Sequence, residues 1–294
     1  MTLSKDQDPR AEQVSLDNSV GLALASIRSA GAPEPDVLLF AATGAGGLVE
    51  AIRDGVKLDL SDVEGTPAAY DQGVLFAGRV GTTCVWIIED APEAVPNDVA
   101  WTRAFPIWLA AAAGAQFVIH TSAGTALKGT EPGLAAETLV RATDHINLSG
   151  ITPLLGLGSS RLGPLFPDQT RVHDRELGAL AKRLADESDT PLLEAVVACT
   201  LGPALSTPAE FLSYAHAGAG LAVQRLADPL IAAAHAGLGA LALTAVTDVA
   251  GETLSMADMV QRAARVAPSL DALVVRIVEE AGPLVAARRE ETPA

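Results

Sequence analysis

The alternation of short apolar runs with helix-patterned segments is the feature that most constrains this chain. Residues 37–42, 115–121, 192–200 and 238–247 are apolar runs of strand length, rich in Val, Leu and Ala. Between and after them, apolar residues recur at helical spacing over 101–113, 174–186, 208–217 and 255–280. Strands that alternate with helices favour a mixed or mostly parallel sheet wrapped by helices. The sequence therefore predicts an α/β fold, a single domain with a mixed β-sheet surrounded by helices.

The same pattern predicts the limits of that domain. Residues 1–36 are expected to form an N-terminal helix and a linker, because the helical spacing over 11–30 ends at the segment "GAPEPD". The α/β domain is expected over 37–285, with a helix at 46–54 and a β-hairpin at 73–89. The polar residues 286–294 are expected to be a solvated tail. The chain has no internal repeat.

The balance of charges limits the partners. The chain carries 20 Lys and Arg against 36 Asp and Glu, a formal net charge of −16. So acidic a protein repels nucleic acid and anionic membranes, because the electrostatic term that drives both associations has the wrong sign. No segment has the pattern of a signal peptide or of a membrane span, and 2 cysteines are too few for a disulfide framework. We expect a cytoplasmic protein whose partners are small molecules or copies of itself.

A glycine-rich turn follows the first apolar run. The segment "ATGAGG", residues 42–47, places Thr43 and three glycines between a predicted strand and a predicted helix. Glycines let several backbone N–H groups point at one anion, and the start of a helix adds positive potential. The segment matches neither the GxxxxGK[ST] loop nor the full GxGxxG pattern. From spacing alone it is either a phosphate-binding loop or a tight connection.

Three further segments carry polar groups next to apolar runs. "HTSAGTAL", residues 120–127, is a second candidate rim, because ligands gather at the carboxyl ends of strands in α/β sheets; a plain turn is the equal alternative. "TDHINLSG", residues 143–150, contains an Asp-His pair whose adjacent side chains point to opposite faces of an extended segment, which favours a structural role over catalysis or metal binding. Asp248 directly follows a strongly apolar run and either lies in a pocket or caps the next segment.

These segments, in this order, resemble the trimeric purine nucleoside phosphorylase family, which includes the methylthioadenosine phosphorylases. The resemblance is carried by "TGAGG", "HTSAGTAL", "DHINLSGITPLLG", "GPALSTPAEF" and "AAAHAGLGALALTAVTD", and it spans about residues 37–280. It implies a homotrimer with active sites near the subunit interfaces. In this family, phosphate attacks C1′ of a purine nucleoside and releases the base and ribose 1-phosphate. No cofactor and no metal are implied.

The resemblance assigns the base and sugar side of the site. Asp248 stands at the base-recognising position, where Asp is typical of members that act on 6-aminopurines, and Ser206 stands where the methylthioadenosine enzymes have Ser. Met256 falls near the sugar 5′ position, where an apolar side chain suits a 5′-deoxy or thioether group. Phe166 matches the aromatic residue that a neighbouring subunit lends to the site. Leu205 replaces a base-stacking Phe and keeps an apolar wall.

The phosphate side matches the family poorly. Thr43 keeps the hydroxyl of the first loop, and Ala123 and Gly124 belong to the altered second loop. Gln224 and Arg225 stand where the family has a Met-Ser or Met-Thr pair.

The segment in which the family has Arg and His reads "IIEDAPEAVP", which places Glu89, Asp90 and Pro92 there. Carboxylates beside a phosphate repel it by several kcal/mol, even at an effective dielectric constant of about 20.

The predicted function is cleavage or formation of the N-glycosidic bond of a 6-aminopurine nucleoside, including 5′-modified ones. Phosphate bound through Thr43 and Arg225 is one co-substrate, and water activated by Glu89 or Asp90 as base is the alternative. A repurposed scaffold that acts on an apolar non-nucleoside substrate as a cyclase or isomerase is an alternative. A non-catalytic nucleoside-binding protein is a third.

Overall fold

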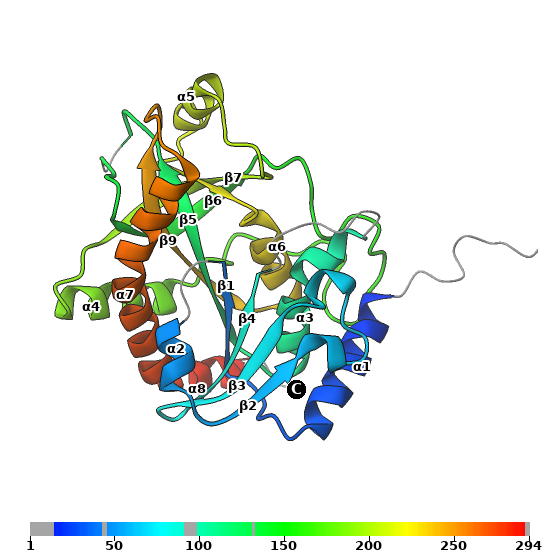
Figure 1. Ribbon diagram of the computed structural model, residues 1–294. Helices are drawn as coiled ribbons and strands as arrows, with labels where there is room; N and C mark the ends of the chain where they lie inside the picture. The colour runs from blue at the N-terminus through cyan, green and yellow to red at the C-terminus, as the bar shows by residue number, and fades with distance from the viewer. Residues whose placement is uncertain (1–14, 43–45, 91–98, 131–132, 292–294) are drawn as a thin grey trace, which may run out of the picture.

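The computed structural model describes residues 15–42, 46–90, 99–130 and 133–291. Within these ranges, nine strands form one sheet in the order β2-β3-β4-β1-β5-β8-β7-β6-β9, and β5 also pairs with β9. The β5–β9 pairing closes β5, β8, β7, β6 and β9 into a ring, while β1 to β4 extend from β5 as an open sheet (Figure 1). The strands are β1 Val37–Ala41, β2 Arg53–Asp59, β3 Val74–Val80, β4 Thr83–Glu89, β5 Phe117–Ala126, β6 Leu139–Asn147, β7 Leu192–Thr200, β8 Leu221–Gln224 and β9 Gly239–Val249.

Parallel and antiparallel pairs occur together in this sheet. β1 runs parallel to both β4 and β5, and β5 runs parallel to β9. β3 and β4 form the antiparallel hairpin that the sequence predicts at 73–89. The prediction of a mixed sheet surrounded by helices in one α/β domain is confirmed.

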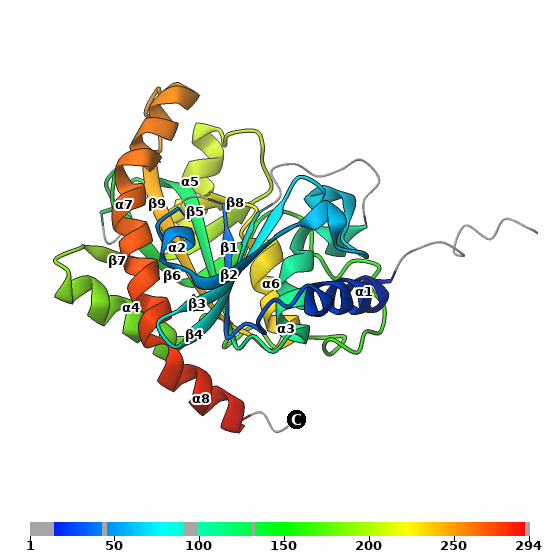
Figure 2. The ribbon, with the colours of Figure 1, turned by 60° about the horizontal axis from the view of Figure 1, so that its bottom comes forward.

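The helices cover both faces of the sheet. They are α1 Leu16–Ser29, α2 Gly46–Ala51, α3 Phe105–Ala112, α4 Arg175–Glu187, α5 Pro208–His216, α6 Ala227–Ala236, α7 Met256–Glu280 and α8 Gly282–Glu291. One hydrophobic core contains α1, α3 and α6, with Trp108 and Phe105 among its largest buried side chains. The other contains the inner faces of α4, α7 and α8. Figure 2 shows these two groups of helices on opposite sides of the strands.

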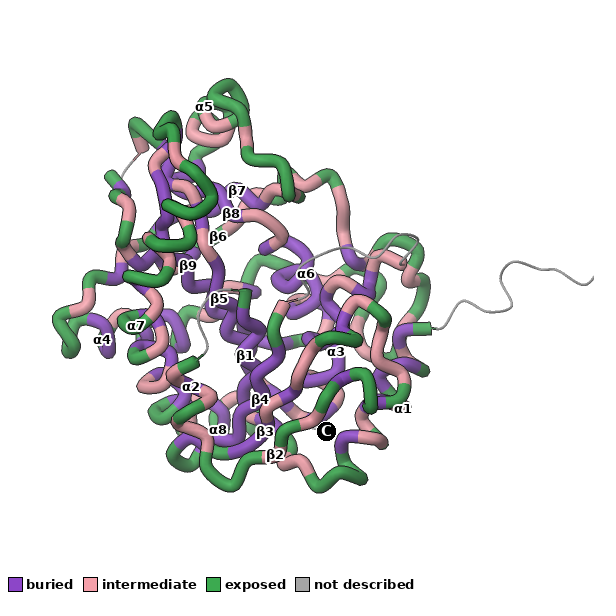
Figure 3. Tube along the Cα trace, viewed as in Figure 1, coloured by how far each residue is buried: buried purple, intermediate pink, exposed green. Residues whose placement is uncertain are grey.

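The central strands are almost completely buried. All five residues of β1 are buried, and so are the first six of β4. By contrast, α5 contains no buried residue, and Figure 3 shows it standing out from the body of the protein. Because parallel strands need helices on both faces, burial of β1 and β4 follows from their central position. No helix in the described part of the chain is long and apolar enough to cross a membrane.

Three elements differ from the predicted ones. The helix predicted over 46–54 ends at Ala51, and β2 begins at Arg53. β5 extends through Ala126, so "HTSAGTA" is strand and not a turn. Residues 286–291, expected in a solvated tail, belong to α8, whose Arg288 and Arg289 pair with Asp174 and Asp36.

Candidate active site

A cavity of about 290 Å³ lies where β5, β8 and β9 end near the start of α7. Both backbone segments and side chains form its wall: Ala123, Gly124, Thr125, Leu205, Ala222, Gln224, Thr247, Asp248, Met256, Met259, Val260 and Ala263. Six of these residues, Ala123, Gly124, Leu205, Gln224, Asp248 and Met256, are site residues predicted from the sequence. The fold therefore brings together segments more than 130 residues apart at the strand ends, where α/β proteins bind ligands.

Close packing of β5 against its neighbours shapes the floor of the cavity. A side chain at Gly124 would place its Cβ 2.9 Å from the Ala222 carbonyl oxygen, so only glycine fits there. The pairing of β5 with β9 shifts register between Gly124 and Thr125, which sets Thr125 opposite Asp248. Such an irregularity changes the direction in which a strand presents its side chains. This irregularity lies in the cavity wall, because Gly124, Thr125 and Asp248 all line the cavity.

Asp248 is the buried carboxylate of the cavity. Asp248 is 8% exposed, and its Oδ1 accepts a hydrogen bond from the Thr247 hydroxyl at 2.8 Å. Among the described residues, no group bonds Oδ2. Arg262 of α7 donates to the Thr247 carbonyl oxygen at 3.1 Å and holds the strand end in place. One carboxylate oxygen is thus fixed by the protein, and the other remains for a ligand.

The mouth of the cavity is apolar. Leu205, Met256 and Val260 line it and are 55%, 63% and 60% exposed. Gln224 donates from Nε2 to the Ala204 carbonyl oxygen at 3.1 Å, which anchors the loop that carries Leu205. Exposed apolar side chains around a cavity with one buried carboxylate suit a ligand with a polar base and an apolar substituent.

Two predicted site residues next to this region lie outside the cavity lining. The Ser206 hydroxyl lies 3.3 Å from that of Tyr214 in α5, so it faces the helix. Phe166 is 87% exposed and makes no part of the lining. Thr43 falls outside the described residues. Arg225 directly follows Gln224 in the chain but is not part of the cavity lining.

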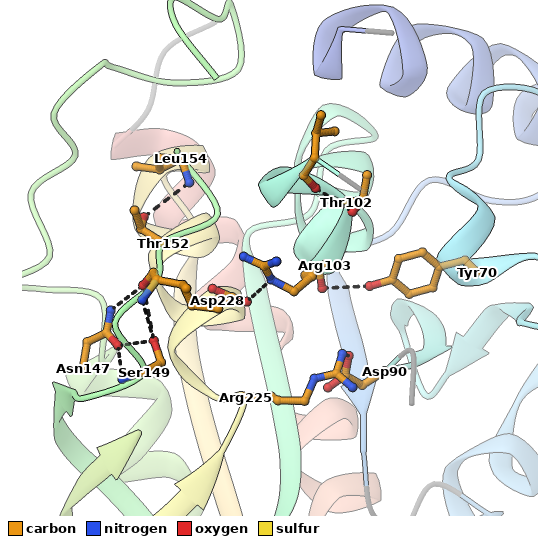
Figure 4. Close-up of polar contacts among 12 residues, drawn as sticks. Tyr70, Asp90, Thr102, Arg103, Asn147, Ser149, Thr152, Leu154, Arg225 and Asp228 are labelled. Carbon is orange, nitrogen blue, oxygen red and sulfur yellow. Dashed lines mark hydrogen bonds and ion pairs between the residues drawn. The ribbon is translucent and has the colours of Figure 1, made fainter. Parts of the chain in front are cut away.

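Arg225 forms an ion pair with Asp90. The Arg225 Nη2 lies 3.5 Å from Asp90 Oδ1, and the Asp90 side chain is only 9% exposed (Figure 4). Arg225 has a φ of 62°, in the left-handed region that non-glycine residues seldom adopt. His120 Nε2 lies 4.0 Å from Asp90 Oδ2. Burial, followed by the charge of Arg225, lowers the pKa of His120 to about 3, so this imidazole is neutral.

A second buried ion pair lies beside the first. Arg103 Nε donates to Asp228 Oδ2 at 2.7 Å, and Tyr70 donates to the Arg103 carbonyl oxygen at 2.9 Å (Figure 4). Burial raises the pKa of Asp228, although the hydrogen bond from Arg103 opposes this effect. Both arginines shown in this cluster therefore face a carboxylate.

The start of α2 is also bonded to a carboxylate. The backbone N–H of Gly47 donates to Asp271 Oδ2 of α7 at 2.9 Å. A Cβ at position 47 would lie 2.9 Å from the Asp271 Cβ, so this approach requires glycine. Within its described part, the glycine-rich turn thus packs α2 against α7.

A cluster that sequence spacing does not reveal lies on β6. His145 Nδ1 and His173 Nε2 are 3.0 Å apart. Asp144, His145 and His173 each offer one ligand atom within 4.8 Å of the other two. Burial is the main cause that lowers the pKa of both imidazoles, and the pKa of His173 falls to about 4. The structure therefore gives His145 a partner 28 residues along the chain, which adjacency in "TDHINL" does not indicate.

A larger hollow of about 790 Å³ lies along α4, but most of its charged lining residues are paired with one another. Arg141 pairs with Glu194, and Arg183 with Glu187, both within the lining. Lining groups that satisfy each other leave little for a ligand. The cavity beside Asp248 is therefore the better candidate site.

Comparisons with known proteins identify the family of the chain. The profile of the phosphorylase superfamily matches residues 36–279. Purine nucleoside phosphorylase 1 of Bacillus subtilis is 27% identical over 223 residues, which cover 75% of this chain and 81% of that protein. Purine nucleoside phosphorylase of Mycobacterium tuberculosis is 31% identical over 215 residues, which cover 72% of this chain and 75% of that protein.

Solved structures show the same fold. A purine nucleoside phosphorylase of Schistosoma in complex with hypoxanthine superposes with a TM-score of 0.81 at 21% identity, covering 91% of this chain and 99% of that one. The chain thus has the fold of that enzyme. It belongs to the phosphorylase superfamily and is similar to its purine nucleoside phosphorylases, which confirms the family resemblance seen in the sequence.

Proposed function

We propose that the protein cleaves, or forms, the N-glycosidic bond of a 6-aminopurine nucleoside that carries an apolar 5′ substituent. The family supplies the reaction class, since its members named above are purine nucleoside phosphorylases. The cavity beside Asp248 supplies the position of the substrate. The choice of base and of 5′ group rests on the residues that line it.

The observation that carries the proposal is the buried carboxylate of Asp248 in the cavity wall, of which Oδ1 is bonded by Thr247 and Oδ2 has no bond from a described residue. A carboxylate only accepts hydrogen bonds, and the exocyclic amino group of adenine donates them. A 6-oxopurine presents a carbonyl oxygen at the same place, so two acceptors would face each other. In a cavity with little access to water, an unmatched acceptor is strongly unfavourable. Asp248 therefore favours adenine over hypoxanthine.

The apolar mouth supports the 5′ preference. Met256 and Val260 come from the first turns of α7 and offer no hydrogen-bond donor to a 5′ hydroxyl. A thioether or methyl group would bury apolar surface against them. 5′-Methylthioadenosine combines this group with a 6-aminopurine. It is the substrate that best matches both ends of the cavity.

The chemistry follows from where charge develops. As the C1′–N9 bond lengthens, the sugar gains oxocarbenium character and the base gains electrons. Hydrogen bonds that N–H groups of the base donate to Asp248 hold the leaving group in place while it takes up this charge. The protein's part is to fix the base at Asp248 and the sugar over the ends of β5 and β8.

We also propose a homotrimer in which Phe166 reaches a neighbouring site. Four large apolar side chains of the segment before α4 are exposed: Leu148, Leu155, Leu165 and Phe166, the last by 87%. A neighbouring copy would cover them. Sedimentation equilibrium should give about three times the chain mass of 30.1 kDa. A stable species of one chain mass contradicts this assembly.

The direct test is base release followed by chromatography. The protein is incubated in phosphate buffer with 5′-methylthioadenosine, adenosine or inosine, and free adenine and hypoxanthine are quantified. The proposal predicts the fastest release from 5′-methylthioadenosine and at least 10-fold slower release from inosine. Preferred release of hypoxanthine from inosine would contradict the assignment of Asp248. No release from any nucleoside would contradict the reaction itself.

A further inference from the structure

Two described groups from segments that the sequence connects with anion binding are bonded to the chain's own carboxylates. Arg225 directly follows Gln224, which lines the cavity, but its guanidinium pairs with Asp90 at 3.5 Å. The backbone N–H of Gly47 at the start of α2 bonds Asp271 at 2.9 Å. Two anion-binding groups from different elements are thus each bonded to an internal carboxylate.

Among the described residues, the charges of the two neighbouring ion pairs balance. Arg103 pairs with Asp228 at 2.7 Å, so the described cluster of Arg225, Arg103, Asp90 and Asp228 is neutral (Figure 4). His120, whose Nε2 lies 4.0 Å from Asp90, is 3% exposed and uncharged. An entering phosphate dianion would meet the Asp90 carboxylate without an unpaired cation from this cluster. Like charges at close range in a partly desolvated site repel strongly.

The sheet order places Asp90 at the same edge of the sheet as Asp248. Asp248 ends β9, and the order across the sheet from there is β9, β5, β1 and β4. Asp90 directly follows β4, and its backbone N–H donates to the carbonyl oxygen of Ala41, the last residue of β1, at 2.8 Å. β9, β5, β1 and β4 run parallel to their neighbours in this order, so Asp248 and Asp90 both lie at the carboxyl ends of strands, with β5 and β1 between them. The sugar of a base held at Asp248 has to lie over β5 and β1 for Asp90 to reach it. Arg225 joins from the end of β8.

We propose that water, and not inorganic phosphate, is the co-substrate of this enzyme, and that Asp90, held by Arg225, is the base that activates it. The inference rests on the nucleoside-cleaving function proposed above and names the nucleophile of the same site. Glu89 has no comparable position, because its side chain is exposed while that of Asp90 turns inward. A buried carboxylate also stabilises the positive charge that develops on the sugar.

The step balances without another reactant. The water oxygen forms a bond to C1′ as the C1′–N9 bond breaks, and the electron pair of that bond goes to the purine. Asp90 accepts one proton from the water and later returns it to solvent, and a purine nitrogen takes one proton from solvent. The products are the free base and the free sugar, with no change of oxidation state.

The test measures adenine release from 5′-methylthioadenosine in rigorously phosphate-free buffer and in the same buffer with inorganic phosphate. Mass spectrometry identifies the sugar product. We expect equal release in both buffers and the unphosphorylated sugar as the product. Release that requires phosphate, with the sugar 1-phosphate as product, overturns this inference and leaves the proposed function standing. No release in either buffer overturns both.

Asp90→Asn and the matched control Glu89→Gln test the role of the carboxylate. We expect Asp90→Asn to lower release in phosphate-free buffer at least 100-fold, the contribution typical of a general base, with unchanged affinity for adenine by calorimetry. Glu89→Gln should retain the wild-type rate. Equal rates for wild type and Asp90→Asn overturn the role of Asp90, and affinity measured on the same sample shows whether that variant is folded.

Discussion

Replacing Asp248 by Asn should reverse the preference for the purine base. The Asp248 residue is 8% exposed, so water screens its hydrogen bonds little. Oδ1 is held by Thr247 at 2.8 Å, and an Asn side-chain oxygen can accept the same bond. Its amide nitrogen would then face the ligand in place of Oδ2. The variant loses one charge-assisted hydrogen bond to the adenine amino group, worth about 1.5–3 kcal/mol.

That loss corresponds to a fall of about 10- to 150-fold in kcat/KM for 6-aminopurine nucleosides. The amide nitrogen can donate to the oxygen of a 6-oxopurine, so kcat/KM for inosine should rise. Both are measured by base release from adenosine and inosine under identical conditions. Thr247→Val keeps the carboxylate and serves as a control. Its kcat/KM for adenosine should fall less than that of Asp248→Asn, and its kcat/KM for inosine should not rise. If Asp248→Asn lowers kcat/KM for adenosine and for inosine by the same factor, Asp248 does not distinguish the bases.

Three further predictions follow from the same structure. Met256→Gln should lower kcat/KM for 5′-methylthioadenosine relative to adenosine by about 3- to 10-fold, the modest effect expected of one partly exposed apolar contact. Arg103→Met should lower the free energy of unfolding by about 3–5 kcal/mol at pH 8, because it leaves the buried Asp228 carboxylate unpaired; the loss should be smaller at pH 5, since a raised Asp228 pKa makes the folded state bind the proton more readily than the unfolded state. His120, with a folded pKa of about 3 against 6.5, makes wild-type stability fall as the pH drops below 6.5, because the unfolded chain binds the extra proton; urea unfolding at pH 7.5 and 5 should show this fall reduced by about 2 kcal/mol in His120→Leu. The first account is contradicted if Met256→Gln leaves the ratio of kcat/KM for the two nucleosides unchanged. The second is contradicted if the loss of unfolding free energy in Arg103→Met is larger at pH 5 than at pH 8. The third is contradicted if the unfolding free energies of wild type and His120→Leu depend on pH in the same way.

The periodic pattern predicted most of the fold because strands and helices here have strong apolar signatures. The buried run 37–41 and the hairpin of β3 and β4 illustrate this. β2 was not predicted, since "RDGVKLD" lies at the sheet edge, is mostly exposed and has no apolar alternation. α8 was not predicted because Gly282 and Pro283 are typical of a helix end, although tertiary ion pairs hold the helix that follows.

The site was predictable only where the sequence resembles a family. The resemblance identified six residues that line the cavity, Asp248 and Met256 among them. The ion pair of Arg225 with Asp90 joins residues 135 apart, and the bond from Gly47 to Asp271 spans 224 residues. No local spacing indicates such contacts, because they depend on which strand ends and helices the fold places side by side. Among the described residues of the glycine-rich turn, Gly47 serves the packing of α2 against α7.

A crystal structure of the protein with 5′-methylthioadenosine, or with its released adenine, tests the account most directly. We expect the purine in the cavity at the ends of β5, β8 and β9, with its amino group within about 3 Å of Asp248 Oδ2. The 5′ thioether should lie against Met256. A purine bound elsewhere, or bound in this cavity with its amino group directed away from Asp248, would contradict the central claim that this carboxylate selects the base.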